Sequence, residues 1–152
     1  MTNSSSSPII GRILLLDDNS LGLAARRSVL EELGHKVTTL STPHEALEVC
    51  GKQRFDLVVT DYKMPKMNGV EFIARLRKQH PVIGVILISG FTDTLGLNEA
   101  NTGADVVLQK SSHEVSHLIR SVNRLLRQQR APKRKSAASQ GSSKAEKRKT
   151  KA

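Results

Sequence analysis

Short apolar runs alternate along the chain with stretches whose apolar residues recur every three or four positions. The runs are rich in Leu, Ile and Val and predict five strands, at residues 9–16, 35–40, 56–60, 85–88 and 105–109. The periodic stretches predict five helices, at about residues 20–33, 42–51, 70–79, 92–101 and 115–126. Strands that alternate with helices through short loops form an α/β fold, a doubly wound five-stranded parallel sheet with helices on its two faces.

Local signals mark where several of these helices begin and end. Ser20 is expected to cap the first helix, and Gly34 lies just beyond its last turn. The run Thr42-Pro43-His44-Glu45 forms a capping box with proline at the first helical position. The fourth helix is predicted to be the least stable, because Gly96 lies inside it.

Composition divides the 152-residue chain into one domain and two polar ends. Residues 1–8 are rich in Ser, and residues 131–152 contain no Leu, Ile, Val, Met or aromatic residue. We therefore expect a disordered leader and a disordered tail around a domain at 9–130. The tail carries eight Lys or Arg against Glu146, so it holds +7 of the net charge of +10. Such a tail either remains solvated or contacts nucleic-acid phosphates without reading their sequence.

The sequence also indicates the cellular compartment of the protein. No apolar run approaches the length needed to cross a bilayer, and the first eight residues lack the basic and apolar regions of a secretory signal. The single cysteine, Cys50, excludes an intramolecular disulfide framework and fits a reducing compartment. We expect a cytoplasmic protein without membrane contact.

Polar side chains follow four of the predicted strands where the chain leaves the sheet: Asp17, Asp18, Asp61, Ser89 and Lys110. Parallel strands place their carboxyl ends at one edge, which is where open α/β sheets bind ligands, so these side chains should converge. Three carboxylates held close together repel one another, and Mg²⁺ relieves that repulsion because it prefers oxygen ligands. Lys110 and Ser89 would then surround a phosphoryl group on Asp61 with the charge and hydrogen bonds that phosphoryl transfer requires.

Four segments, LLLDDNS, VVTDYKMPKMNG, LISG and ADVVLQK, carry a family resemblance. In order and spacing they resemble the receiver domains of bacterial two-component response regulators, over roughly residues 10–128. The resemblance implies a flavodoxin-like strand order of 2-1-3-4-5. We expect a stand-alone receiver, because no output domain is recognisable after it. It also implies phosphorelay signalling, in which a histidine kinase or phosphotransfer protein supplies the phosphoryl group and a downstream protein binds the changed face. Such a chain is a signalling protein, not an enzyme acting on other molecules.

The resemblance also gives the residues of the cluster their roles. Asp61 resembles the phosphoacceptor, Lys110 resembles the lysine that contacts the phosphoryl group, and Ser89 resembles the switch hydroxyl. Asp18 would bind Mg²⁺ directly, while Asp17 would orient the metal or its water. The metal ligands that the resemblance implies are Asp17, Asp18, Asp61 and the backbone carbonyl of Lys63.

Two residues depart from the family pattern. Val107 stands where receivers usually carry the Tyr or Phe that moves inward on phosphorylation. Ser111 follows Lys110, where the family usually has proline behind a cis peptide bond, and a cis bond before a non-proline residue costs about 3 kcal/mol more than trans. These departures predict a different loop after Lys110 and a different output route.

Two other functions remain open from the sequence. The first is a phosphorylation-independent adaptor whose basic tail binds nucleic acid or an acidic partner. The second is a hydrolase that uses the same carboxylates and Mg²⁺, in the manner of the acid-nucleophile phosphatases. Those enzymes need a second acid two residues beyond the nucleophile, where this chain has Lys63, and the hydrolase is therefore the weakest alternative.

Overall fold

The computed structural model describes residues 9–90 and 92–130, so the expected leader 1–8 and tail 131–152 lie outside the described residues. The strands are β1 Arg12–Leu16, β2 Lys36–Leu40, β3 Leu57–Asp61, β4 Gly84–Ser89 and β5 Val106–Gln109. The helices are α1 Ser20–Glu32, α2 Pro43–Lys52, α3 Gly69–Gln79, α4 Thr92–Leu95, α5 Glu99–Thr102 and α6 Glu114–Arg130. All strand pairs are parallel, in the order β2-β1-β3-β4-β5. The predicted fold class and strand order are confirmed.

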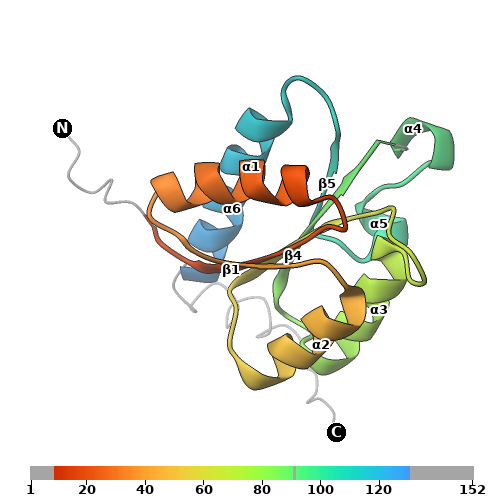
Figure 1. The fold of residues 1–152 in the computed structure, drawn as a ribbon, viewed down its shortest axis with the longest axis horizontal. Helices are drawn as coiled ribbons and strands as arrows, with labels where there is room; N and C mark the ends of the chain where they lie inside the picture. Colours follow the sequence, from red (N-terminus) through yellow and green to blue (C-terminus); the bar gives the residue numbers. More distant parts are fainter. Residues whose placement is uncertain (1–8, 91, 131–152) are drawn as a thin grey trace, which may run out of the picture.

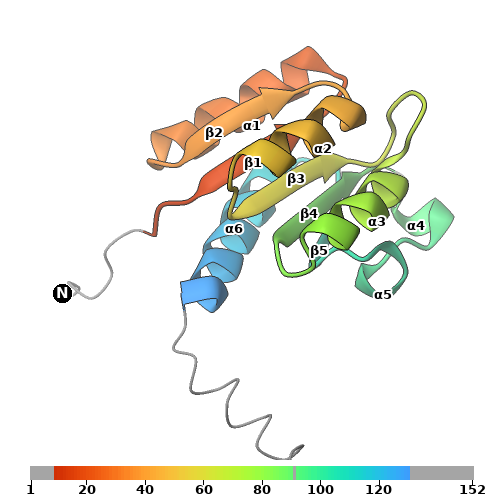
Figure 2. The same cartoon turned by 90° about the horizontal axis from the view of Figure 1, so that it is seen from below.

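The sheet lies between two layers of helices, with α1 and α6 on one face and α2 and α3 on the other (Figures 1 and 2). Alternate residues of the central strands enter the two cores, since successive side chains of a strand point to opposite faces. Val58, for example, packs in the core with Phe72 of α3, whereas Val59 packs in the core with Leu126 of α6. All four of these side chains are buried, so both faces of the central strands are covered.

The N-terminus of α1 is capped one residue earlier than predicted. Asn19, not Ser20, is the capping residue, and its Oδ1 accepts the backbone N–H groups of Leu21 at 3.0 Å and Gly22 at 3.1 Å. The extended backbone of Asn19, with φ −97° and ψ 110°, turns its side chain toward these groups. The predicted cap of α2 is confirmed, because Oγ1 of Thr42 accepts the N–H of Glu45 at 3.3 Å.

The fourth predicted helix is two short helices. Gly96 has φ +65°, a left-handed conformation that interrupts a helix, and α4 ends just before it. Asn98 and Asn101 then form a reciprocal capping box that begins α5, and Gly103, with φ +80°, ends it. The prediction of one continuous helix was therefore wrong, although the weak point was correctly placed at Gly96.

Strand β5 forms one edge of the sheet, and its outward side is partly closed by α5. The backbone N–H of Val107 donates to Oε2 of Glu99 at 3.0 Å. The side chain of Val107 is half-buried against the core beneath α2 and α3. The residue that replaces the expected aromatic ring is therefore part of the packing of this edge.

Helix α6 has the clearest amphipathic pattern, as the sequence predicts. Its buried side consists of Leu118, Ser121, Val122, Leu125 and Leu126. Arginine side chains lie on its exposed side. Among the described residues, no helix has the length and apolar character to span a membrane.

Candidate functional site

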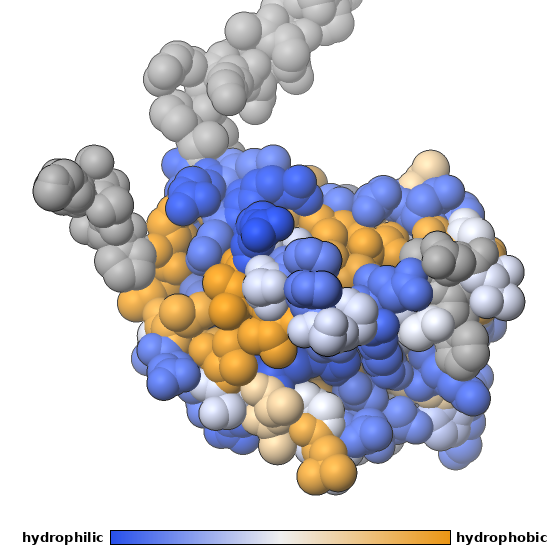
Figure 3. Space-filling view, turned by 90° about the horizontal axis from the view of Figure 1, so that it is seen from above, coloured by the Kyte–Doolittle hydropathy of each residue, from blue (hydrophilic) through white to orange (hydrophobic). Residues whose placement is uncertain are grey.

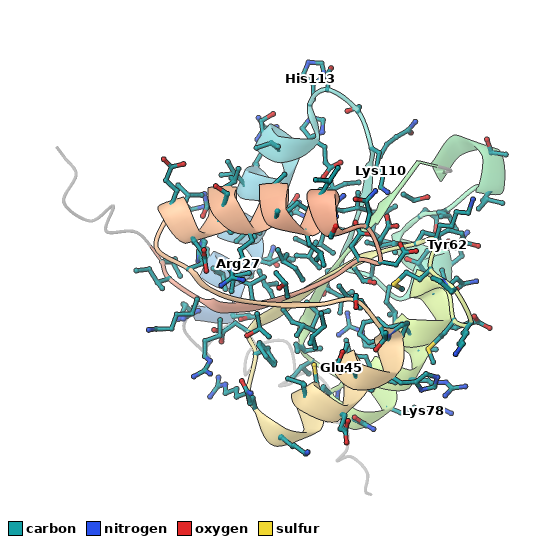
Figure 4. The ribbon with its side chains drawn as sticks, in the orientation of Figure 1. Arg27, Glu45, Tyr62, Lys78, Lys110 and His113 are labelled. Atoms are coloured by element: carbon teal, nitrogen blue, oxygen red, sulfur yellow. The ribbon has the colours of Figure 1, made fainter. Side chains whose placement is uncertain are left out.

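The five polar side chains predicted for the site lie where the strands end, on the same side of the sheet. Asp61 ends β3 and Ser89 ends β4, while Asp17 and Asp18 follow β1 and Lys110 follows β5. Figure 4 shows Lys110 and Tyr62 at this end of the molecule. An open pocket lies here, lined by Asp17, Asp18, Asn19, Asp61, Lys63, Met64, Pro65, Gly90 and Lys110.

Three carboxylates form the acidic part of the pocket. One oxygen from each of Asp17, Asp18 and Asp61 lies within 4.8 Å of the other two. Asp17 and Asp61 are only 1 % and 3 % exposed, whereas Asp18 is exposed to solvent. Two of the three negative charges are therefore held out of water, where their mutual repulsion is strong.

Lys110, which directly follows β5, supplies a positive charge to the pocket. Its Nζ lies 2.8 Å from Oδ1 of Asp61, and that oxygen accepts no other hydrogen bond from the described part of the chain. The backbone N–H of Lys110 donates to the carbonyl of Ser89 at 3.0 Å, which fixes the loop after β5 against the end of β4. Burial raises the pKa of Asp61, and the nearby Asp17 adds to this effect, while Lys110 and Arg26 only partly offset it.

Asp61→Asn is expected to raise the free energy of unfolding at pH 7 when divalent metals are removed. Because its folded-state pKa is raised, ionisation of Asp61 costs the folded state more than the unfolded chain. The gain should shrink as the pH falls toward about 4, the ordinary carboxyl pKa, since both states then bind the proton. Urea denaturation of both proteins in chelator between pH 4 and 7 measures this, and a variant less stable than wild type at pH 7 would contradict it.

Ser89 is placed differently from the other predicted residues. It is 1 % exposed, and the residues that line the pocket include its neighbour Gly90 but not Ser89 itself. In the register of β3 and β4, Asp61 pairs with Ile88, so Ser89 stands one residue beyond the level of Asp61. The hydroxyl is therefore adjacent to the pocket, while Gly90 forms its wall.

The loop after Asp61 is held by backbone hydrogen bonds at both ends. The N–H of Tyr62 donates to the carbonyl of Ile88 at 2.9 Å, and the N–H of Gly69 donates to the carbonyl of Tyr62 at 2.7 Å. Asn68 and Glu71 form a capping box that begins α3 directly after the loop. These contacts fix the backbone that carries Asp61 and Lys63.

Gly69→Ala is expected to lower stability by roughly 1–3 kcal/mol, the usual cost of overpacking. A Cβ at Gly69 would lie 2.5 Å from the carbonyl oxygen of Asp61 and 2.7 Å from Cδ1 of Leu87. The backbone beneath the site would have to move. Gly51→Ala is the matched control, because its Cβ meets nothing within 4 Å and alanine is the better helix former. Thermal unfolding of both variants checks this, and equal stabilities would contradict it.

Arg26 is a residue near the site that sequence analysis missed. It is 6 % exposed, and its guanidinium contacts Asp17 and Glu114, both at 2.7 Å. Its spacing of four residues before the buried Leu30 of α1 was the available signal, because that position faces the core. A charged side chain at a core-facing position indicates a buried partner.

The oxygen donors of the pocket fit a hard divalent cation. Carboxylates are the ligands that Mg²⁺ prefers, and the exposed position of Asp18 leaves room for the waters that Mg²⁺ retains. The buried oxygen Oδ1 of Asp61 pairs with a cation, Nζ of Lys110, and accepts no other hydrogen bond from the described residues. This donor set can therefore hold Mg²⁺ beside a group that reacts at Asp61.

Residues 13–123 match the model of the response regulator receiver domain family. The chain belongs to this family. The receiver domain is 31 % identical over 117 residues to the gliding motility regulatory protein of Myxococcus xanthus, covering 75 % of this chain and 15 % of that protein. It is 30 % identical over 119 residues to the alkaline phosphatase synthesis transcriptional regulatory protein PhoP of Bacillus subtilis, covering 74 % and 48 %. The chain thus spans less than half the length of these relatives.

Solved receiver structures share the fold. The receiver domain of Francisella response regulator 1452 has a TM-score of 0.71 and 29 % identity, with 78 % of this chain and 98 % of that chain covered. The response regulator TrrA of Thermotoga maritima, solved in complex with Mg(2+)-BeF, has a TM-score of 0.68 and 27 % identity, with 75 % and 97 % covered. The acidic pocket of the receiver domain described above lies in the part of the fold that the family shares.

Proposed function

We propose that this chain is a cytoplasmic phosphorelay protein that accepts a phosphoryl group on Asp61 in a Mg²⁺-dependent reaction. In this proposal it acts as a signalling protein and not as an enzyme on other substrates. A histidine kinase or phosphotransfer protein supplies the phosphoryl group, and a downstream protein binds the changed surface. The observation that carries the proposal is the placement of Asp61 between two further carboxylates and the ammonium of Lys110.

Five residues of the pocket have a part in this reaction. A carboxylate oxygen of Asp61 attacks the phosphorus of a phosphohistidine, so a P–O bond forms and the P–N bond to the imidazole breaks. Lys110 already contacts Oδ1 of Asp61 and can stabilise the negative charge on the transferred oxygens. Asp17, Asp18 and the backbone carbonyl of Lys63 would hold Mg²⁺ together with Asp61. When bound, the metal supplies positive charge to the phosphoryl oxygens.

Burial of the acceptor favours this chemistry. Asp61 is almost completely enclosed, so its carboxylate is poorly hydrated and available as a nucleophile once its charge is balanced. The wall of the pocket at Gly90 has no side chain, and a Cβ there would contact only Cδ of Lys110, at 3.9 Å. The space beside Asp61 is therefore kept open by a glycine.

The test is phosphorylation by a small donor. Incubation with acetyl phosphate and Mg²⁺ should add the mass of one phosphoryl group, measured by intact-protein mass spectrometry. Chelation of Mg²⁺ should prevent the addition. Absence of any adduct, or an adduct that forms equally well in chelator, would contradict the proposal.

A second candidate function is binding of a polyanion by α6 and the basic tail. His113, His117, Arg120, Arg124 and Arg127 recur at steps of four and three residues, and all are exposed. The rings of the two histidines stack with centroids 6.1 Å apart. No acidic residue follows Glu114 until Glu146, although the same stretch contains eight Lys or Arg. Figure 3 shows the side of α1 and α6, with a strongly hydrophilic surface where α6 ends. This charge fits the phosphates of nucleic acid.

Retention on double-stranded DNA tests this second function. The full chain should be retained at low salt and released as salt rises, because such contacts depend on counterion release. Replacing Arg120, Arg124 and Arg127 by Gln should weaken retention and reduce its salt dependence by up to about three phosphate contacts. A chain truncated after residue 130 measures how much of the retention on DNA depends on the tail. Retention that neither change reduces would contradict nucleic-acid binding by this surface.

A further inference from the structure

Arg26 ties the acidic pocket to the beginning of α6. It lies in α1, whereas Glu114 is the first residue of α6, and these two helices cover the same face of the sheet (Figure 1). Nη1 of Arg26 lies 2.7 Å from Oδ2 of Asp17, and Nε lies 2.7 Å from Oε2 of Glu114. The side chains of Arg26 and Asp17 are 7 % and 2 % exposed, so this bridge is shielded from solvent.

The bridge occupies one oxygen of Asp17 and fixes the direction of the other. Oδ2 of Asp17 accepts from Arg26, and Oδ1 accepts the backbone N–H of Asn19 at 2.9 Å. Both oxygens therefore have a donor within the protein. A cation that binds in the pocket must share the charge of Asp17 with the guanidinium.

Two positive charges lie on different sides of the carboxylates of the pocket. Three carboxylates face the ammonium of Lys110, and Arg26 adds a second positive charge on the side of Asp17. Glu114 draws the guanidinium toward α6 and so partly offsets its effect on Asp17. Burial acts to lower the pKa of Arg26, but its contacts with Glu114 and Asp17 outweigh burial and raise it, so the guanidinium keeps its charge.

We propose that Arg26 is a positioning residue that holds Asp17, weakens Mg²⁺ binding in the pocket and transmits occupancy of the pocket to the first turn of α6. The inference rests on the proposed function, because it assigns a role at the same metal site. Mg²⁺ competes with Arg26 for the charge of Asp17. When the contact between Arg26 and Asp17 weakens, Arg26 is held more strongly by Glu114. Because such coupling is reciprocal, a change in the contact with Glu114 also changes the contact with Asp17.

This link provides an output route that does not need an aromatic ring at residue 107. Val107 is half-buried and packs with the core on the opposite face of the sheet. Arg26 and Glu114, in contrast, connect the pocket to α6, whose exposed side carries the arginines described above. A change at Asp17 would therefore reach the surface through α6.

Mg²⁺ titration of matched variants tests the proposal. Isothermal titration calorimetry gives the affinity, and fluorescence of Tyr62, the single tyrosine in a chain without tryptophan, gives a second readout beside the pocket. Arg26→Met should tighten Mg²⁺ binding roughly fivefold or more, within the usual range of such coupling. Glu114→Gln should weaken it, because the guanidinium is then left to Asp17 alone. Arg27→Met removes the same charge from the next position, where the arginine pairs with Glu31 on the surface, and should change little.

Two further measurements separate the bridge from general electrostatics. In the Arg26→Met background, Glu114→Gln should have no further effect on Mg²⁺ affinity, since the connecting guanidinium is gone. Hydrogen exchange at the first turn of α6 should respond to Mg²⁺ in wild type but not in Arg26→Met. Arg26→Lys, which keeps the charge but has one nitrogen, should keep near-wild-type affinity and lose the α6 response.

The outcomes distinguish this inference from the proposed function. A folded wild-type protein that binds no Mg²⁺ would contradict the proposed function. A wild type that binds Mg²⁺, with Arg26→Met binding equally or more weakly, would overturn only the role of Arg26. An α6 response to Mg²⁺ that persists in Arg26→Met would overturn the link to α6. Circular dichroism of each variant establishes that it is folded at the titration temperature.

Discussion

Asp61→Asn is expected to abolish phosphoryl transfer to this protein. The amide has no negative charge and cannot form the acyl phosphate, and no other carboxylate of the pocket combines burial with the contact to Lys110. Intact-protein mass spectrometry after incubation with acetyl phosphate and Mg²⁺ should show the adduct in wild type and none in the variant. Loss of folding would not explain this result, since the same substitution is expected to stabilise the protein without metal.

Asp56→Asn is the matched control for this experiment. Asp56 precedes β3, while Asp61 ends it, so the two carboxylates stand at opposite ends of this strand. The side chain of Asp56 accepts the N–H of Arg12 at 2.8 Å, a role that the amide oxygen of Asn can keep. The control should therefore be phosphorylated like wild type. An adduct that persists in Asp61→Asn would show that another residue is the acceptor.

Lys110→Met is expected to slow phosphorylation about a hundredfold, the usual cost of removing one group that stabilises a developing charge. Methionine keeps most of the aliphatic stem but removes the ammonium, which lies 2.8 Å from Oδ1 of Asp61. The rate of adduct formation at fixed donor and Mg²⁺ concentrations measures the effect. The adduct should still form at long times, because the acceptor itself is intact.

Lys78→Met removes the same charge from an exposed position on α3 and serves as the control for Lys110 (Figure 4). It should leave the rate unchanged, since surface charges outside the pocket are screened by salt. If Lys110→Met reacted as fast as wild type, the ammonium would have no part in transfer. Equal slowing in both variants would indicate a loss of long-range attraction for the donor.

The resemblance to receiver domains predicted the strand order. The pattern of apolar and polar residues predicted that the site lies at the carboxyl ends of the strands. Each strand ends at a polar residue, so the convergence of Asp17, Asp18, Asp61 and Lys110 required only that the strands be parallel. Helix boundaries were less predictable. Asn19 and Ser20 are both good capping residues, and only the backbone conformation decides between them.

Tertiary contacts explain what the sequence could not show. Arg26 looks like one of two neighbouring surface arginines, and its burial depends on Glu114, 88 residues away. The space requirement at Gly69 likewise depends on the carbonyl of Asp61 at the end of β3 and on Leu87 of β4, not on its immediate neighbours in the chain. The peptide bond before Ser111 is trans, like all peptide bonds in the described parts of the chain, so the loop after Lys110 differs from the usual family pattern.

The contact between Glu99 and the N–H of Val107 limits how two copies of the protein can associate. A free edge strand offers its outward N–H and C=O groups to another chain and invites continuation of the sheet between molecules. In β5 the carboxylate of Glu99, the first residue of α5, already occupies one such donor. Sheet extension between molecules at this edge would have to displace the carboxylate of Glu99 from the N–H of Val107, which makes such association less favourable.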